Sequence, residues 1–212
     1  MDAQLLLAKA SFSMSLVAFE LPSRVNQALA AFRQRRHVLI YCFNAPALNR
    51  SNKREHIREL LRQFLMSYAE TSAVKLSIDN QRGVVPTILL NGRQIHVSIS
   101  HAALVSCVAL SLDYKIGVDL IDLNEIKESE DLLPTAKLFL SPDIATSLAN
   151  SKEHEFCFNF GIEWAKREAS LKCLGLPIIE WTQHDPCHLH KMIVEFMDID
   201  SRYILAQARL RV

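Results

Sequence analysis

Glycine scarcity is the feature that most restricts what this chain can form. Only five of its 212 residues are glycine, whereas glycine makes up roughly 7% of an average protein. All five lie after residue 82, at scattered positions: Gly83, Gly92, Gly117, Gly161 and Gly175. Neither a GxGxxG fingerprint nor a GxxxxGK[ST] loop can be drawn from them. If the chain binds a phosphate or a nucleotide, it must do so without a glycine-rich loop.

The remaining composition is that of one compact globular unit with a sizeable core. Hydrophobic residues make up 50% and charged residues 22% of the sequence, which excludes disordered and collagen-like classes. No apolar run approaches the roughly 18 to 20 residues that a membrane-spanning helix needs, so we expect no membrane partner. Asp2 stands in place of a basic leader region and Lys9 interrupts the first apolar run. We therefore expect no signal peptide and interpret the N-terminus as the start of the mature fold.

The cysteines indicate a reducing compartment. There are five of them, an odd number, and no two form a CxxC motif: Cys42, Cys107, Cys157, Cys173 and Cys187. A disulfide framework needs paired cysteines, so this pattern predicts free thiols and a cytoplasmic protein.

Basic and acidic residues are segregated along a chain whose formal net charge is only +1. Residues 24–62 contain nine basic and two acidic residues, a net charge of +7, and residues 113–131 contain seven acidic residues and two lysines, a net charge of −5. Such segregation indicates an anionic partner for one segment and a cation for the other, or else two solvated faces.

The first half of the chain alternates strand-like and helical patterns. Strands are predicted at 13–21 and 37–43, and helices at 23–33 and 51–69. Ser23 is the expected N-cap of the first helix, and Ser51 or Asn52 that of the second. Further on, an Asn91-Gly92 pair between the runs 87–90 and 94–100 predicts a β-hairpin.

The second half begins with two more predicted strands, 104–112 and 115–123, joined by a turn at Asp113-Tyr114. A helical pattern over 132–150 is broken at Pro142, and a long helix over 153–173 is expected to stop at Gly175 and Pro177. The tail, 178–212, predicts two or three strands.

Asp119 interrupts the apolar run 116–121. A carboxylate inside a buried strand costs several kcal/mol unless it is paired or bound to a metal. Two interpretations remain open from this residue alone: an ion pair with an arginine, or an oxygen ligand for a hard cation such as Mg2+.

The helical segment 164–172 carries the second candidate group. Trp164, Glu168 and Lys172 stack at i, i+4 and i+8. Ordinary surface pairing, with Glu163 and Arg167 as a second i,i+4 pair, would explain the charges. Phe156 and Phe160, however, lie on the same helix face as Trp164 and should face the core. Because Glu168 and Lys172 share this face, we expect them to point toward the protein and not toward water.

A third group lies in the tail, where four potential metal ligands are close together in sequence: His184, Cys187, His188 and His190. A zinc ion would take two ligands from this group, but the spacing matches no standard zinc finger and the chain has no second ligand pair. A polar loop is the preferred interpretation.

Three short motifs in order resemble the 4'-phosphopantetheinyl transferases of the larger, surfactin-synthetase type. They are Val-Ser-Ile-Ser-His at 97–101, Gly-Val-Asp at 117–119, and Trp-Ala-Lys-Arg-Glu-Ala-Ser-Leu-Lys at 164–172. The resemblance covers residues 85–175, and the first 80 residues fit loosely through a basic helix. It implies an α+β pseudo-dimer of two similar halves, 1–112 on the coenzyme A side and 113–212 with the metal and catalytic residues.

The resemblance also implies a chemistry that needs no glycine loop: Mg2+-dependent transfer of phosphopantetheine from coenzyme A to a serine of an acyl or peptidyl carrier protein. Asp119 and Glu168 would hold Mg2+. Glu168, or a water on the metal, would take the serine proton, and Lys172 would stabilise the departing phosphate. Ser100 and His101 would contact the 3'-phosphate of coenzyme A.

The basic helix supplies further expectations. Lys53 or Arg54 lies near the position where the family has an arginine that binds this phosphate. The surplus positive charge suits an acidic carrier protein. The expected form is a monomer that binds no nucleic acid, because the basic segment has few aromatic residues and the whole chain is not basic.

Some positions depart from the family pattern. The third acid is replaced by Ile121, with Asp122 on the opposite strand face; Arg167 replaces a lysine; Val85 replaces the lysine of a Gly-Lys-Pro motif; and Ala102 replaces a common serine. The alternative function is therefore a divergent, catalytically weak or inactive member that binds an acidic partner.

Overall fold

The computed structural model describes residues 16–44, 49–70, 87–90, 92–127, 131–189 and 191–210, and these form an α+β fold built on two sheets. The first sheet contains β1 (Ala18–Glu20), β2 (His37–Phe43), β3 (Thr87–Leu90), β4 (Arg93–His101) and β5 (Val105–Ser111). Its spatial order is β1-β2-β5-β4-β3, with β1 parallel to β2 and the other pairs antiparallel.

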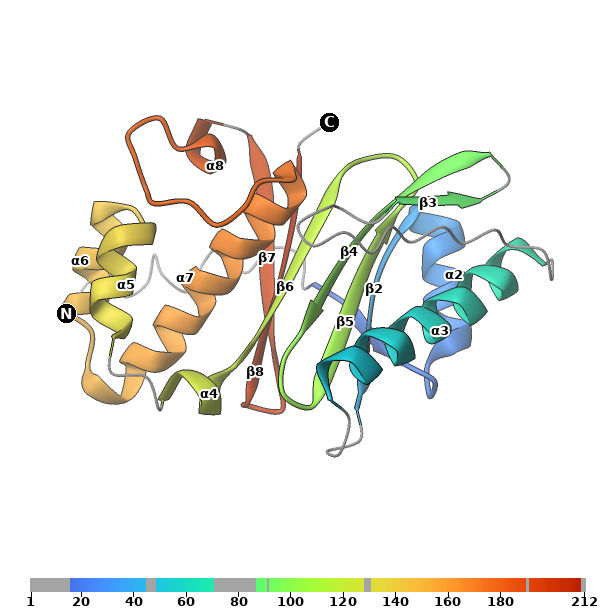
Figure 1. Cartoon of the computed structure of the whole chain (residues 1–212), viewed down its shortest axis with the longest axis horizontal. Helices are drawn as coiled ribbons and strands as arrows, with labels where there is room; N and C mark the ends of the chain where they lie inside the picture. The colour runs from blue at the N-terminus through green and yellow to red at the C-terminus, as the bar shows by residue number, and fades with distance from the viewer. Residues whose placement is uncertain are drawn as a thin grey trace, which may run out of the picture.

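The second sheet is antiparallel and contains β6 (Ile116–Asp122), β7 (Met192–Ile199) and β8 (Tyr203–Leu210), in the order β6-β8-β7. The helices are α2 (Val25–Arg35), α3 (Arg50–Ala69), α4 (Leu123–Lys127), α5 (Leu132–Phe139), α6 (Pro142–Ala149), α7 (Glu153–Leu174) and α8 (Pro186–Leu189). Figure 1 shows α2 and α3 at one end of the molecule, α5 to α8 at the other, and the sheets between them.

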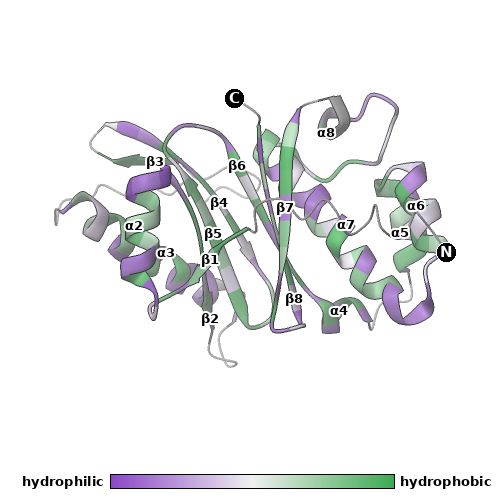
Figure 2. Ribbon diagram, turned by 180° about the vertical axis from the view of Figure 1, so that it is seen from behind, coloured by the Kyte–Doolittle hydropathy of each residue, from purple (hydrophilic) through white to green (hydrophobic). Residues whose placement is uncertain are grey.

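Three apolar clusters hold these layers together. Phe32 of α2 and Phe64 of α3 pack on Ile40 and Val108, on the outer face of the first sheet. A second cluster fills the space between the two sheets, with Leu39, Cys107 and Ala109 against Val118 and Leu205. In the third, Ala165, Ala169 and Cys173 of α7 pack on Ala206 and Ala208 of β8. The order of layers is helix, sheet, sheet, helix, with apolar strands in the middle (Figure 2).

Most of the predicted elements are confirmed, and the helix caps show where local signals were misread. Asn49, and neither Ser51 nor Asn52, caps α3: its side chain accepts a hydrogen bond from the Asn52 N–H. Ser23 does not cap α2; its hydroxyl donates to the Glu20 carbonyl, and the N-cap is Arg24. The shift arises because a hydroxyl can satisfy a preceding carbonyl as well as a helix N–H.

The ends of the later helices follow the predictions. Pro142 is the first residue of α6 and Ser141 caps it, so the predicted break separates α5 from α6. Gly175 ends α7 in the left-handed conformation, at φ 73°. The short helices α4 and α8 were not predicted.

The predicted hairpin is confirmed as β3 and β4, with Gly92 at φ 78°. The strands after it are confirmed too, but β5 and β6 do not pair: they belong to different sheets, and β6 pairs with β8 instead. Residues 13–15 of the first predicted strand, Asn91, residues 84–86 and His190 lie outside the described residues.

Candidate active site

Asp119 lies on β6 where this strand meets β4, and it is only 3% exposed. Ser100, near the end of β4, donates a hydrogen bond to Asp119 Oδ1 at 2.8 Å. Lys172 Nζ donates to the same oxygen at 2.5 Å and to Ser100 Oγ at 3.2 Å. Asp119 Oδ2 is buried and has no partner within the described ranges. The buried acid therefore pairs with a lysine instead of an arginine and keeps one carboxylate oxygen available.

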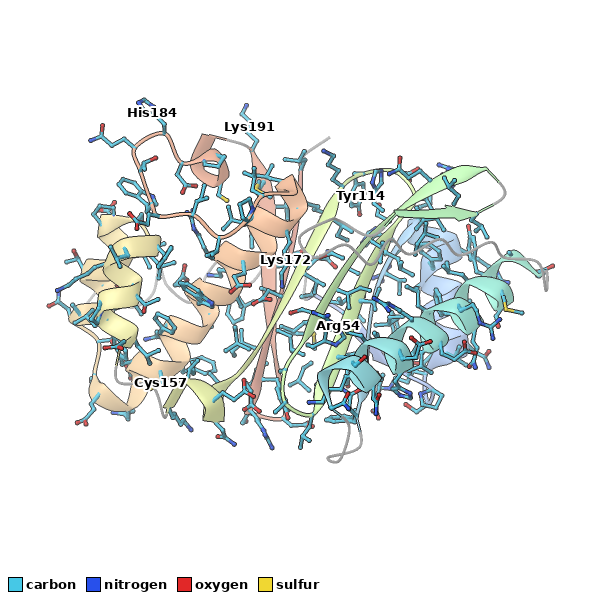
Figure 3. The ribbon with its side chains drawn as sticks, in the orientation of Figure 1. Arg54, Tyr114, Cys157, Lys172, His184 and Lys191 are labelled. Atoms are coloured by element: carbon cyan, nitrogen blue, oxygen red, sulfur yellow. The ribbon has the colours of Figure 1, made fainter. Side chains whose placement is uncertain are left out.

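The predicted stripe on α7 is confirmed. The rings of Phe156, Phe160 and Trp164 stack in series, with centroids 6.3 and 5.7 Å apart. Trp164 Nε1 donates to Glu168 Oε1 at 2.9 Å, and Glu168 Oε2 lies 3.7 Å from Lys172 Nζ. The stripe continues into the contact with β6, and Figure 3 shows Lys172 extending from α7 toward the strands.

Gly117 allows α7 to approach β6 this closely. A Cβ atom at residue 117 would lie 2.0 Å from the Ala169 carbonyl oxygen and 2.4 Å from the Cys173 nitrogen. Both are backbone atoms, so no side-chain rotation could relieve the clash. The absence of a side chain at Gly117 therefore brings Glu168 and Lys172 within reach of Asp119, two residues further along the strand.

These four residues, Ser100, Asp119, Glu168 and Lys172, are termed the carboxylate site. Burial raises the pKa of Glu168, the neighbouring Asp119 raises it further, and Lys172 and Trp164 offset only part of the shift. Burial opposes the ammonium form of Lys172, but Asp119 and Glu168 together outweigh it and raise the pKa of Lys172. The site thus pairs a carboxyl that takes a proton more readily than usual with a lysine that stays charged.

The other predicted site residues lie near this site to different degrees. His101 follows Ser100, and its Nδ1 lies 2.8 Å from Ser106 Oγ. Lys53 of α3 is half-buried and donates to the Ala103 carbonyl, which brings it close to the same strand end. Arg54 is exposed on α3, as Figure 3 shows.

Two polar residues beside His101 were missed. Ser106 is fully buried on β5 and accepts a 2.8 Å hydrogen bond from Asn44 Nδ2, just after β2. Ser106 contacts the ring of His101, and Asn44 holds the Ser106 hydroxyl. No local signal marks them, because a serine inside an apolar strand and an asparagine after another strand become neighbours only through the sheet.

Arg167 does not pair with Glu163 as the spacing suggested. Its guanidinium lies 2.5 Å from the buried Asp185 carboxylate, and it donates to the Ile179 carbonyl at 3.0 Å. Glu163 pairs with Lys166 at 2.8 Å. Arg167 therefore anchors the segment after α7 and takes no part in the carboxylate site.

Asp122 takes no part in it either. Arg202 binds its carboxylate through both Nε and Nη2, the closest contact being 2.7 Å. This agrees with the predicted opposite orientation of Asp119 and Asp122 on one strand, and it leaves two carboxylates at the site.

The tail cluster has no metal-binding geometry in the part that the structure describes. His184 is exposed and the Cys187 N–H donates to Asp185; the side chains of His188 and His190 lie outside the described residues. Within the described ranges, no three His, Cys, Asp or Glu side chains converge in a way suited to a metal ion. The predicted polar loop is wrong for 186–189, which form the short helix α8.

The carboxylate site contains two carboxylates of the ligand type that Mg2+ prefers. Asp119 and Glu168 lie 2.5 and 3.7 Å from the same ammonium group, that of Lys172. Asp119 Oδ2 is an oxygen without a partner, the ligand type that Mg2+ prefers. Mg2+ commonly takes one or two carboxylates and completes its octahedron with water and substrate phosphates.

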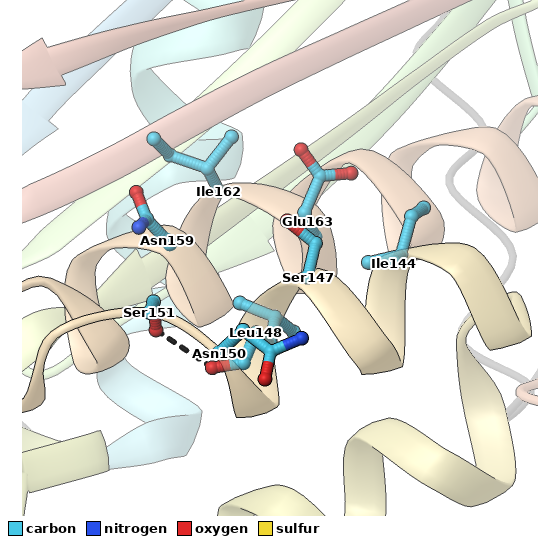
Figure 4. A pocket seen from close by; sticks show the side chains of 8 residues that line it. All are labelled: Ile144, Ser147, Leu148, Asn150, Ser151, Asn159, Ile162 and Glu163. Carbon is cyan, nitrogen blue, oxygen red and sulfur yellow. Dashed lines mark hydrogen bonds between the residues drawn. The ribbon is translucent and has the colours of Figure 1, made fainter.

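A pocket of about 710 Å³ between α6 and α7 lies apart from these residues (Figure 4). Its one charged lining residue is Glu163, which already pairs with Lys166. We therefore assign it no chemistry.

Comparisons with known proteins add no assignment: no protein-family model matches the chain, and no curated protein matches it significantly. Among the described helices, none is both long and apolar enough to cross a membrane.

Proposed function

We propose that this chain transfers the 4'-phosphopantetheine arm of coenzyme A to a serine of an acyl or peptidyl carrier protein and releases 3',5'-ADP. The observation that carries the proposal is that Lys172 Nζ contacts Asp119, Glu168 and Ser100 together. The three motifs that suggested the function are far apart in sequence, and their polar residues meet at one place. The proposed architecture is a pseudo-dimer of halves 1–112 and 113–212.

In this reaction Glu168 acts as the base. The serine oxygen of the carrier protein attacks the β-phosphorus of coenzyme A, a new P–O bond forms, and the bond to 3',5'-ADP breaks. The serine proton passes to Glu168. Trp164 holds this carboxylate by its hydrogen bond to Oε1, which leaves Oε2 to accept the proton.

Lys172 stabilises the charge that develops on the leaving 3',5'-ADP. Its raised pKa keeps it protonated, and its position between Asp119 and Ser100 fixes the ammonium before the substrate arrives. A charge that is already oriented requires little reorganisation during the reaction.

Asp119 and Glu168 are the residues that would hold Mg2+. When bound, the ion supplies positive charge that neutralises the pyrophosphate and orients it for displacement. The available Asp119 Oδ2 supports this assignment.

Coenzyme A would be bound by the residues around the end of β4. His101, held by Ser106, and Lys53, held at the Ala103 carbonyl, lie close enough in the fold to bind one 3'-phosphate. Ser100 already donates to Asp119, so it would also orient the carboxylate. Arg54, exposed beside Lys53, would meet either this phosphate or the acidic carrier protein.

The proposed setting is a cytoplasmic monomer. All five cysteines are free thiols, three of them buried, which supports a reducing compartment.

The direct test mixes the purified chain with coenzyme A, Mg2+ and several apo carrier proteins and detects the added arm by mass spectrometry. Glu168→Gln and Asp119→Asn should each lower the rate by about 10²- to 10⁴-fold. Glu163→Gln is the matched control, since this glutamate lies on α7 and pairs with Lys166 outside the site. Transfer to none of the carriers would refute the enzymatic proposal.

Calorimetry distinguishes the enzyme from an inactive relative that only binds an acidic partner. The enzyme should bind coenzyme A more tightly with Mg2+, and Asp119→Asn should remove that difference. Binding of carrier protein without any binding of coenzyme A would favour the relative.

A further inference from the structure

The two sheets also meet at a second place, where a pocket of about 490 Å³ lies between β1, α2 and β2 on one side and β7 and β8 on the other. This volume falls within the range of roughly 300 to 1,000 Å³ that is typical of small-molecule sites. None of the residues of the carboxylate site lines it. A ligand here would therefore be independent of the proposed transfer reaction.

The lining of this pocket is divided by polarity. The first sheet and α2 contribute mostly apolar side chains, among them Phe19, Val38 and Leu39. The second sheet contributes only polar ones: Glu195, Gln207 and Arg209. Such a division fits a ligand with an apolar part and a polar head.

The lining of the pocket as a whole carries a net positive charge. Arg35 and Arg209 contribute two positive charges and Glu195 one negative charge. His37 donates from Nδ1 to the Arg35 carbonyl, which only accepts, at 3.0 Å. Burial and the nearby Arg209 and Arg35 lower the pKa of His37 despite this hydrogen bond, which keeps the ring neutral. The pocket thus has a net charge of about +1, which suits a single negative charge better than a phosphate dianion.

Arg209 is held near Tyr114 and Glu195, and one of its nitrogens has no partner among the described residues. Its guanidinium lies 5.8 Å from the centre of the Tyr114 ring and 4.0 Å from Glu195. Arg209 Nε is buried and lacks a hydrogen-bond partner among the described residues. A buried N–H without an acceptor is unfavourable, and a ligand carboxylate would supply that acceptor.

We propose that this pocket, termed the basic pocket, binds a carboxylate that carries an apolar chain of about eight carbons, with Arg209 and Arg35 on the carboxylate and the apolar lining of the first sheet along the chain.

The test is calorimetric titration of the full chain with sodium octanoate, octan-1-ol and octylamine. Octanoate should bind with a dissociation constant below about 1 mM, and the alcohol and the amine should bind at least tenfold more weakly. Octanol that binds as tightly as octanoate would overturn the assignment of a carboxylate site. The absence of any heat of binding with millimolar octanoate would refute the proposal that the basic pocket binds such a ligand.

Variants locate the binding. Arg209→Gln and Arg35→Gln should each weaken octanoate about tenfold or more, because each removes a charge-assisted contact. Arg33→Gln is the matched control on α2, since Arg33 contacts Glu70 and the Ser67 carbonyl instead of the pocket. Arg35 is exposed, so its variant tests the proposal even if Arg209→Gln fails to fold. Octanoate binding that neither pocket variant weakens would refute the proposal.

Discussion

The carboxylate site and the basic pocket, the two places where the sheets meet, differ in how their charged side chains are paired. At the carboxylate site, Lys172 contacts both carboxylates and Ser100 also binds Asp119, so each carboxylate has an opposite charge beside it and only Asp119 Oδ2 lacks a partner among the described residues. At the basic pocket, Arg209 lies 4.0 Å from Glu195 and 5.8 Å from the centre of the Tyr114 ring, and its Nε has no partner within the described ranges.

The helix α7 accounts for much of this difference. It packs on the face of the second sheet that carries Asp119 and supplies Glu168 and Lys172 to it. The lining of the basic pocket includes no residue of α7. Where α7 approaches β6 it supplies an opposite charge to Asp119, whereas at the basic pocket it supplies none to Arg209.

The largest effect is expected for Gly117→Ala. The new Cβ would meet the backbone of α7 at 2.0 Å, so the helix must move and the fold should lose about 3 kcal/mol of stability. Gly161→Ala is the control: its Cβ would lie 2.9 Å from the flexible end of Leu123, and the gain in helix propensity of about 1 kcal/mol offsets that contact. Urea denaturation measures the free energy of unfolding of both variants. An equal loss in the two would show that the close approach of α7 to β6 does not depend on the missing side chain at Gly117.

Next in size is Lys172→Met. It leaves two carboxylates facing each other without their cation, and removal of one partner from a fully buried pair costs about 3–5 kcal/mol. Lys172 is 32% exposed, so we expect about 2–3 kcal/mol. Lys166→Met, which removes the partner of Glu163 on the same helix, should cost less than about 1 kcal/mol. Adding Asp119→Asn to Lys172→Met should recover part of the loss; a purely additive result would mean that the two residues do not interact.

Local signals in the sequence predicted the parts of the carboxylate site that lie on single elements. The periodicity of the aromatic residues placed Glu168 and Lys172 on the inward face of α7, and the apolar neighbours of Asp119 placed it in a buried strand. Asn91-Gly92 predicted the hairpin that ends near Ser100. In each case the prediction depends on hydrophobic periodicity or on turn residues within a few positions of the sequence.

The relations that could not be predicted are all long-range. The short turn between β5 and β6 does not say which strand each one pairs with: β6 pairs with β8 near the end of the chain, and α7 packs on these two strands. Helical spacing offered Glu163 as a partner for Arg167, but it says nothing about the loop that brings Asp185 beside this arginine. The basic pocket joins residues from both ends of the chain, and no local pattern marks it.

The pH dependence of stability should distinguish the two regions by its sign. The pKa of Glu168 is raised above 4.5 in the folded chain, so the folded state holds this proton more tightly than the unfolded one. Its contribution to stability is complete below pH 4.5 and is lost as the pH rises through the folded value. Glu168→Gln should remove this loss, as measured by urea denaturation across the acid range. A slope unchanged by the variant would assign the proton to another group.

The smallest effect, with the opposite sign, is expected at the basic pocket. The pKa of His37 is lowered below 6.5, first by burial and then by Arg209 and Arg35, so the unfolded chain binds this proton more tightly. Stability should therefore fall as the pH drops from 6.5 through the folded value. His37→Gln should abolish that fall, and Arg209→Gln should only reduce it, because burial remains.

An NMR titration of the His37 ring gives the same comparison directly. Octanoate should raise the pKa of His37 by placing a negative charge beside it, and a pKa unmoved by octanoate would show that the carboxylate binds elsewhere.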